Sequence, residues 1–274
     1  MPVAGTESGC EIYYERHGSH GSPIVLIAGM GGSGRFWQPQ INALSERYRV
    51  IAYDQAGTGR SSRGYSGALS VARMARDIAA VLDAEGIPAA HIVGHAIGGI
   101  IGLQFAATMH PRVLTLTVVN GWAQADAHLR RCFEVRKEIL VRSGARAYLR
   151  AQPLFLFPPR WISENDHHLN AELSEMLAGF PGTEVILGRI DTFLEFDATA
   201  VLGAISVPTL IMASSDDALV PSHLSEALVR GIRGARLQSF ENGAHAFTVV
   251  YPERFNHALL TFLAEHDGSA ESFS

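Results

Sequence analysis

The sequence has little cysteine and no long apolar run. Cys10 and Cys132 are the only cysteines in 274 residues, and they form no Cys-x-x-Cys pair. Two distant thiols favour neither a disulfide framework nor a thiolate zinc site. No segment approaches about 18 uninterrupted apolar residues, and no apolar stretch follows a basic start at the N-terminus. We therefore expect no membrane span and no export, and a cytoplasmic location.

The sequence also lacks the basic excess that nucleic-acid binding requires. Lys and Arg number 22 against 27 Asp and Glu, which gives a net charge of -5. We therefore expect a small-molecule substrate, with no nucleic acid, membrane, metal or other cofactor as a partner. A homodimer is an open alternative to a monomer. Apolar residues make up 47% of the chain and charged residues 18%, which is typical of a globular protein.

Short apolar runs alternate with segments of helical spacing along most of the chain. Strands are predicted at 11–16, 23–28, 49–54, 90–94, 113–120, 208–213 and 235–240, and helices at 36–44, 70–85, 97–109, 222–232 and 252–265. The first strand carries two tyrosines in an alternating pattern that suits the edge of a sheet. The alternation predicts an α/β fold whose mostly parallel sheet is covered by helices on both faces.

One long segment interrupts this alternation. From 121 to 205 the strand signal disappears, and several helices broken by prolines are expected instead. We interpret 121–205 as a helical cap inserted into a core that consists of 1–120 and 206–274. The last residues, 267–274, are small and polar, which predicts a disordered tail.

A seven-residue segment resembles a catalytic turn that lacks its catalytic atom. The segment VGHAIGG at 93–99 matches the G-x-S-x-G elbow between a strand and a helix, but Ala96 stands where the serine would be. The N–H of Ile97 would lie at a helix N-terminus, where negative charge is favoured. With the N–H of Met30 it would form an oxyanion hole that has two donors.

The glycine-rich segment at 29–34 has two interpretations. It formally matches G-x-G-x-x-G, and Asp54 follows about 20 residues later, as in a dinucleotide-binding fold. That interpretation gives no role to the elbow, so we favour a bend that aims a backbone N–H at an oxyanion. Four further residues beside these motifs are predicted to bind substrate: Gly29, Gly31, His95 and Trp122.

An acidic residue and a histidine follow two late strands. Asp216 and Asp217 lie in the segment 214–221, and His245 lies in 242–247. Both segments follow strands, and open α/β sheets bind ligands at the carboxyl ends of their strands. The carboxylate would hold one tautomer of His245 and stabilise its protonated form, so that the other ring nitrogen can take a proton.

The glycine bend, the elbow, the acid and the histidine occur in the chain order of α/β-hydrolases, and the whole chain resembles that superfamily. Within it, the chain is similar to the pyrimidine-utilisation protein D (RutD) family at 27–40, 53–59, 94–98, 119–122, 127–136 and 151–161. The cap segments AHLRRCFEVR and AQPLFLFPPRW carry the most weight, because caps vary widely. The resemblance favours Asp217, four residues before Pro221, as the acid. It also implies that Ala96 is native, and that the substrate is carbamate or aminoacrylate from uracil breakdown.

Such small, labile compounds need only positioned water and donors, so no acyl-enzyme is required. Other functions remain open. The chain could be a serine esterase, lactonase or amidase whose serine was replaced by Ala96, or a non-catalytic binder on the same fold. A third and less favoured alternative is a cofactor-free oxygenase that uses the same His–Asp pair. Ser33 and Ser61 are disfavoured as substitute nucleophiles, because serines in such loops usually form turns.

The segment 130–150 is rich in arginine. It is interpreted as a solvated helix face or as an electrostatic attractor for a small carboxylate. We favour the solvated face for most of these arginines.

Overall fold

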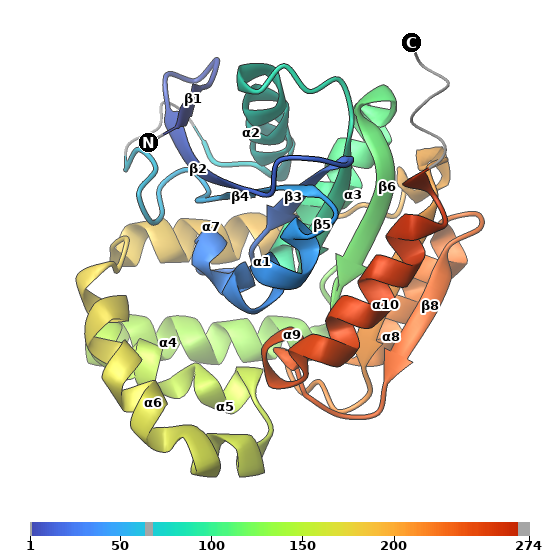
Figure 1. Cartoon of the computed structure of the whole chain (residues 1–274). Coiled ribbons are helices and arrows are strands. Elements are labelled where there is room, and N and C mark those ends of the chain that lie inside the picture. Colours follow the sequence, from blue (N-terminus) through green and yellow to red (C-terminus); the bar gives the residue numbers. More distant parts are fainter. Residues whose placement is uncertain (1, 64–67, 268–274) are drawn as a thin grey trace.

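The computed structural model describes residues 2–63 and 68–267, and within them an eight-stranded sheet forms the centre of the molecule (Figure 1). The order across the sheet is β1-β2-β4-β3-β5-β6-β7-β8. The strands are β1 (Val3–Gly5), β2 (Glu11–His17), β3 (Pro23–Ile27), β4 (Arg49–Tyr53), β5 (Ala90–His95), β6 (Val113–Val119), β7 (Thr209–Ser214) and β8 (Arg236–Phe240). From β4 to β8 neighbouring strands are parallel, whereas β1 and β2 pair antiparallel. The predicted α/β fold class is confirmed.

The edge position predicted for the strand at 11–16 is wrong. That strand is β2, which pairs with β1 on one side and with β4 on the other. β1 has only three residues, which is too short to show the alternation that identifies a strand in a sequence. Tyr13 and Tyr14 of β2 are consequently buried.

Helices cover both faces of the sheet, as the alternation predicts. On one face lie η1 (Gly34–Trp37), α1 (Gln38–Ser45), α9 (Phe247–Val250) and α10 (Pro252–Ala264); on the other lie α2 (Val71–Ala84), α3 (Ile97–Thr108) and α8 (Ser222–Gly231). β3 shows the division, because Ile24 and Leu26 join the first core and Val25 and Ile27 join the second. A strand buried on both faces needs a continuous apolar run, which PIVLI provides.

The helices between β6 and β7 lie on the left side and at the lower left of Figure 1. We call them the cap helices: α4 (Ala127–Ala151), α5 (Pro153–Leu156), α6 (Pro159–Ala178) and α7 (Thr183–Glu195). Pro153 and Pro159 begin helices, since a proline at the first helical position loses no helical hydrogen bond. Two further short 3₁₀ helices are η2 (His110–Arg112) and η3 (Leu202–Ala204). The division at 121 and 205 into core and cap stays a prediction.

The predicted tail, 267–274, lies outside the described residues except for Asp267. The Asp267 carboxylate accepts a hydrogen bond from Tyr48 Oη at 2.6 Å and lies 3.3 Å from His91 Nε2. None of the described helices combines the length and the apolarity that crossing a bilayer requires.

Candidate active site

The turn between β5 and α3 has the backbone geometry of a nucleophile elbow. Ala96 adopts φ 50° and ψ −111°, a left-handed conformation that is strained for alanine. A Cβ added to Gly94 would lie 2.2 Å from the Gly98 carbonyl oxygen, and one added to Gly98 would lie 2.1 Å from that of Ile27. Both positions therefore require glycine. The methyl group of Ala96 offers no nucleophile.

His245 and Asp217 form a buried pair. His245 Nδ1 lies 2.7 Å from Asp217 Oδ2, and the two side chains are 4% and 0% exposed. The other oxygen, Asp217 Oδ1, accepts the backbone N–H groups of Leu219 at 2.8 Å and Val220 at 2.9 Å. The carboxylate is thus held at both oxygens. This contact fixes the His245 tautomer and leaves Nε2 as the nitrogen that can exchange a proton.

The neighbouring carboxylate of Asp216 holds the histidine loop. Asp216 Oδ1 accepts hydrogen bonds from Ser214 Oγ at 2.6 Å and from the N–H of Ala244 at 2.8 Å. Asp216 Oδ2 accepts the N–H of Gly243 at 3.1 Å. Of the two aspartates left open by the motif, Asp217 is therefore the one paired with His245.

Two side chains that the sequence analysis did not identify in this role hold the His245 backbone. The His245 carbonyl oxygen accepts hydrogen bonds at 2.8 Å from His95 Nε2 and from Asn120 Nδ2. Asn120 Oδ1 accepts the N–H of Ser214 at 3.1 Å. Asn120 follows β6 directly and has φ 48°, a conformation that asparagine tolerates. The sequence feature that could have indicated this contact is an asparagine at the carboxyl end of a predicted strand.

His95 lies between two rings. Its ring centroid is 4.6 Å from that of Phe36 and 4.7 Å from that of His245. Burial, and after it the electrostatic interaction with His245, lowers the pKa of His95 to about 3, so the ring is neutral. A carbonyl only accepts, so Nε2 carries the proton that His95 donates to His245. The structure thus gives His95 a positioning contact, while its predicted substrate contact stays a prediction.

The glycine bend passes beside the elbow. A Cβ added to Gly29 would lie 3.7 Å from Ala96 Cβ, and the N–H of Gly32 donates to the Gly29 carbonyl at 3.0 Å. This turn contains Met30 and Gly31. The structure therefore brings the Met30 segment close to the elbow at which Ile97 begins α3.

A buried arginine from the cap holds this bend. Arg189 Nε of α7 donates to the Met30 carbonyl at 3.2 Å, and Arg189 Nη2 donates to Gln55 Oε1 at 2.6 Å. Gln55 Nε2 in turn donates to the Ala28 carbonyl at 2.7 Å. These contacts join residues 134 and 159 positions apart, so no local sequence signal could have indicated them.

Asp54 has no part in a nucleotide site. Its Oδ1 accepts the N–H of Gly34 at 2.8 Å, and its Oδ2 accepts the N–H and the Nε of Arg60, both at 2.9 Å. The carboxylate therefore ties two loops together, and the strand order differs from that of the dinucleotide fold. Ser33 and Ser61 donate to Asp54 as well, the latter to its carbonyl at 2.5 Å, so both hydroxyls serve this loop.

Trp122 is buried after β6, and its indole N–H has no hydrogen-bond acceptor in the part of the chain that the structure describes. Its role as a substrate contact stays a prediction. Within residues 2–63 and 68–267, no group of three or more His, Cys, Asp or Glu side chains could hold a metal ion.

The cap also touches the histidine loop. The N–H of Ala246, the residue after His245, donates to the Leu156 carbonyl at the end of α5 at 2.8 Å. The cap helices therefore contact both the loop of His245, through Leu156, and the glycine bend, through Arg189.

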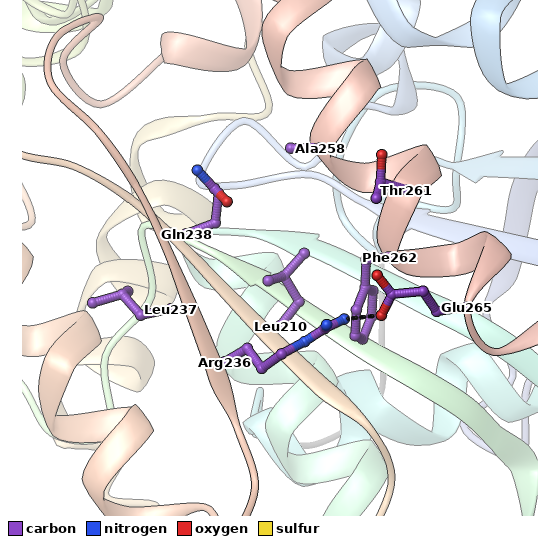
Figure 2. A pocket seen from close by; sticks show the side chains of 8 residues that line it. All are labelled: Leu210, Arg236, Leu237, Gln238, Ala258, Thr261, Phe262 and Glu265. Carbon is purple, nitrogen blue, oxygen red and sulfur yellow. Dashed lines mark ion pairs between the residues drawn. The ribbon is translucent and has the colours of Figure 1, made fainter.

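A shallow pocket lies elsewhere, between β8 and α10 (Figure 2). Arg236 crosses it, paired with Glu265 at 2.7 Å and placed over the Phe262 ring. None of the predicted site residues lines it.

Comparison with known proteins shows that this chain is similar to hydrolases. Residues 22–154 match the alpha/beta hydrolase fold family. A protein of Azorhizobium caulinodans named "Putative carbamate hydrolase RutD" is 58% identical over 94% of this chain and 96% of its own length. A protein of Caulobacter vibrioides with the same name is 47% identical over 94% and 97%.

Solved structures agree on the fold. A hydrolase from Pseudomonas aeruginosa PA01 matches with a TM-score of 0.86 and 25% identity, over 96% of this chain and 97% of its own. The enol-lactonase from Burkholderia xenovorans LB400 matches with a TM-score of 0.87 and 22% identity, over 96% and 100%. The second likeness concerns the fold alone.

Proposed function

The chain belongs to the α/β-hydrolase family and, within it, to the group of relatives named carbamate hydrolase RutD, and from that premise we propose that it hydrolyses a small C–N compound without a covalent intermediate. The substrate is carbamate or aminoacrylate, and water attacks directly. The observation that carries the proposal is a buried His245–Asp217 pair at 2.7 Å on a hydrolase fold whose elbow bears Ala96.

In the proposed reaction His245 acts as general base. Nε2 takes a proton from water while the water oxygen bonds to the carbamate carbon, and Asp217 stabilises the resulting imidazolium. The N–H groups of Met30 and Ile97 hold the negative charge on the tetrahedral oxygens. The imidazolium then gives its proton to the nitrogen, the C–N bond breaks, and ammonia and bicarbonate leave.

Aminoacrylate follows a similar course. A proton from solvent adds to the carbon next to the carboxylate and makes the nitrogen-bearing carbon an electrophilic iminium carbon, to which water adds while His245 takes the proton of that water. The imidazolium then gives this proton to the nitrogen, the C–N bond breaks, ammonia leaves, and the remaining hydroxyl returns its proton to solvent, which leaves an aldehyde. In this proposal both reactions use His245 and the donors at Met30 and Ile97, and neither needs a nucleophile at position 96.

The expected acceleration is modest. One positioned base contributes about 10²–10⁴-fold, and one oxyanion donor contributes roughly 10²–10³-fold. Both substrates decay in water unaided, so this enhancement suffices for a useful enzyme.

The test measures ammonia release from freshly generated substrate, with the unchanged protein, with His245→Ala and with buffer alone. We expect the unchanged protein to exceed buffer and His245→Ala to lose about 10²–10⁴-fold of that excess. His257→Ala, at an exposed position of α10, is the matched control and should keep full activity. Equal rates for protein, variant and buffer would refute the proposal for these substrates.

The backbone strain at Ala96 supports a second candidate function. A left-handed residue at an elbow is the geometry that exposes a nucleophile, so the chain can also be read as a serine esterase, lactonase or amidase with its serine replaced. The native gene sequence at position 96 decides between these two. If neither the present chain nor a serine form turns over any substrate, the fold serves as a binder.

A further inference from the structure

One arginine of the cap is buried among aromatic rings. Arg136 of α4 is 2% exposed, and its guanidinium carbon lies 4.9 Å from the Phe133 ring centroid, 5.4 Å from that of Tyr148 and 5.6 Å from that of Phe155. Arg136 Nη2 donates to Tyr148 Oη at 3.1 Å and to Gln152 Oε1 at 3.2 Å. Arg136 Nε is buried and has no acceptor among the described residues.

The positive charge of Arg136 has no anionic counterpart. Within the described part of the chain no carboxylate lies at ion-pair distance from it, and both of its acceptors are neutral. Burying an unpaired cation costs several kcal/mol, and a cation–π contact returns about 0.5–2 kcal/mol. Most buried arginines are therefore paired with an anion. The unused donor and the unpaired charge indicate that the anion is a ligand.

The position of Arg136 connects it to the His245–Asp217 pair on two sides. Cys132, one turn earlier on α4, lies 3.9 Å from the carbonyl oxygen of Ala218, the residue after Asp217. Phe155, on the other side, precedes Leu156, whose carbonyl accepts the N–H of Ala246. Arg136 thus projects from the part of the cap that contacts both loops of the pair.

We propose that Arg136 binds the carboxylate of a small anionic substrate beneath the cap; this inference rests on the proposed hydrolysis and deepens it. Nε is the unused donor, and a charge-assisted hydrogen bond from it to a carboxylate oxygen would give the guanidinium its anionic partner, while Nη2 keeps its contacts with Tyr148 and Gln152. In aminoacrylate the carboxylate is separate from the nitrogen-bearing carbon, so this contact would hold the carboxylate while that carbon faces His245. Among the arginines of 130–150, Arg136 is therefore the one that serves as an anion site.

The test measures binding, so that it does not depend on turnover. Propionate and propionamide have nearly the same shape, but only propionate carries a charge. We expect calorimetric titration to detect propionate binding and to show propionamide weaker by about 10–100-fold, the range for a hydrogen bond to a charged group. Arg136→Gln should weaken propionate by a similar factor and leave propionamide unchanged.

Two further variants guard against misfolding. Arg136→Lys keeps the charge without the Nε donor and should retain part of the preference for propionate. Arg142→Gln, at a 78% exposed position of the same helix, should behave like the unchanged protein. Equal binding of both ligands to the unchanged protein, or an unaltered preference in a folded Arg136→Gln variant, would overturn the proposal.

If propionate binding depends on Arg136 but ammonia release does not exceed buffer, the anion site stands and the hydrolysis fails. If ammonia release depends on His245 and Arg136→Gln leaves KM unchanged, the reverse holds.

Discussion

At the scale of single residues, the site shows which contacts a sequence motif can carry. The order of elbow, acid and histidine predicted Asp217 and His245, because each follows a strand whose end lies at the same sheet edge. The contacts of Asn120 and His95 with the His245 carbonyl were not predicted, since they depend on how three strand ends meet. A sequence motif therefore predicts which side chains react better than it predicts which side chains hold the backbone of the site.

A serine at position 96 should gain covalent reactivity. An elbow conformation such as that of Ala96 and a His–Asp pair such as His245–Asp217 are the features that activate a serine in this fold. We expect Ala96→Ser to add one phosphonyl group on treatment with a fluorophosphonate, seen by mass spectrometry on the elbow peptide. Ala96→Ser combined with His245→Ala should react at least about 10²-fold more slowly. A single variant that stays unlabelled would show that the hydroxyl does not reach His245.

At the scale of elements, hydrophobic periodicity predicted the buried strands well. It failed where an element was short. The three residues of β1 carry no pattern, and the four-residue α9 follows His245 without one. The prolines expected to interrupt the cap do separate its helices: Pro153 begins α5 and Pro159 begins α6, because the first helical position tolerates proline. α2 followed its amphipathic pattern, although it also buries Asp77.

Asp77 should make stability depend on pH. Burial raises its pKa to about 6, with Arg73 and Arg76 acting in the opposite direction. A carboxyl whose pKa is raised on folding contributes stability that is complete below about pH 4 and is lost as the pH rises through about 6. Asp77→Asn should therefore raise the free energy of unfolding at pH 7.5 by roughly 1–2 kcal/mol and should flatten its change between pH 4 and 7.

Denaturant unfolding at several pH values measures this effect. Asp83→Asn serves as the control on the same helix, because Asp83 is 66% exposed and pairs with Arg112 at the surface. A pH dependence that is the same in the Asp77 variant as in the unchanged protein would mean that Asp77 is ionised in the fold at no cost.

At the scale of the whole molecule, the cap is tied to the site by contacts that span the chain. Arg189 holds the glycine bend from α7, and Leu156 holds the loop of His245 from α5. The sequence predicted a helical segment here, because its strand signal disappears, but it could not show which side chains face the core. These contacts join residues 90 and 159 positions apart, and contacts over such separations depend on the complete topology.

Loss of Arg189 should lower the rate of the proposed reaction more than substrate affinity. Without its hydrogen bonds to Met30 and Gln55, the bend that carries one oxyanion donor loses its support. We expect Arg189→Met to reduce kcat for ammonia release by about 10-fold or more, with KM changed by less than about threefold. Asp191→Asn, which removes a surface ion pair with Lys137 between α7 and α4, should leave kcat unchanged. A raised KM with an unchanged kcat would assign Arg189 to binding.

The hydrogen bond between Leu156 and Ala246 has a consequence for the timing of each turnover. A cap that moved away to admit substrate would break this bond, and a movement of α7 would also release Met30. In an open molecule the loop of His245 and the segment of Met30 would therefore each lack a supporting hydrogen bond. Both hydrogen bonds would form again only when the cap closes. Entry and chemistry would then alternate, and the water molecule consumed would be one trapped with the substrate at closure.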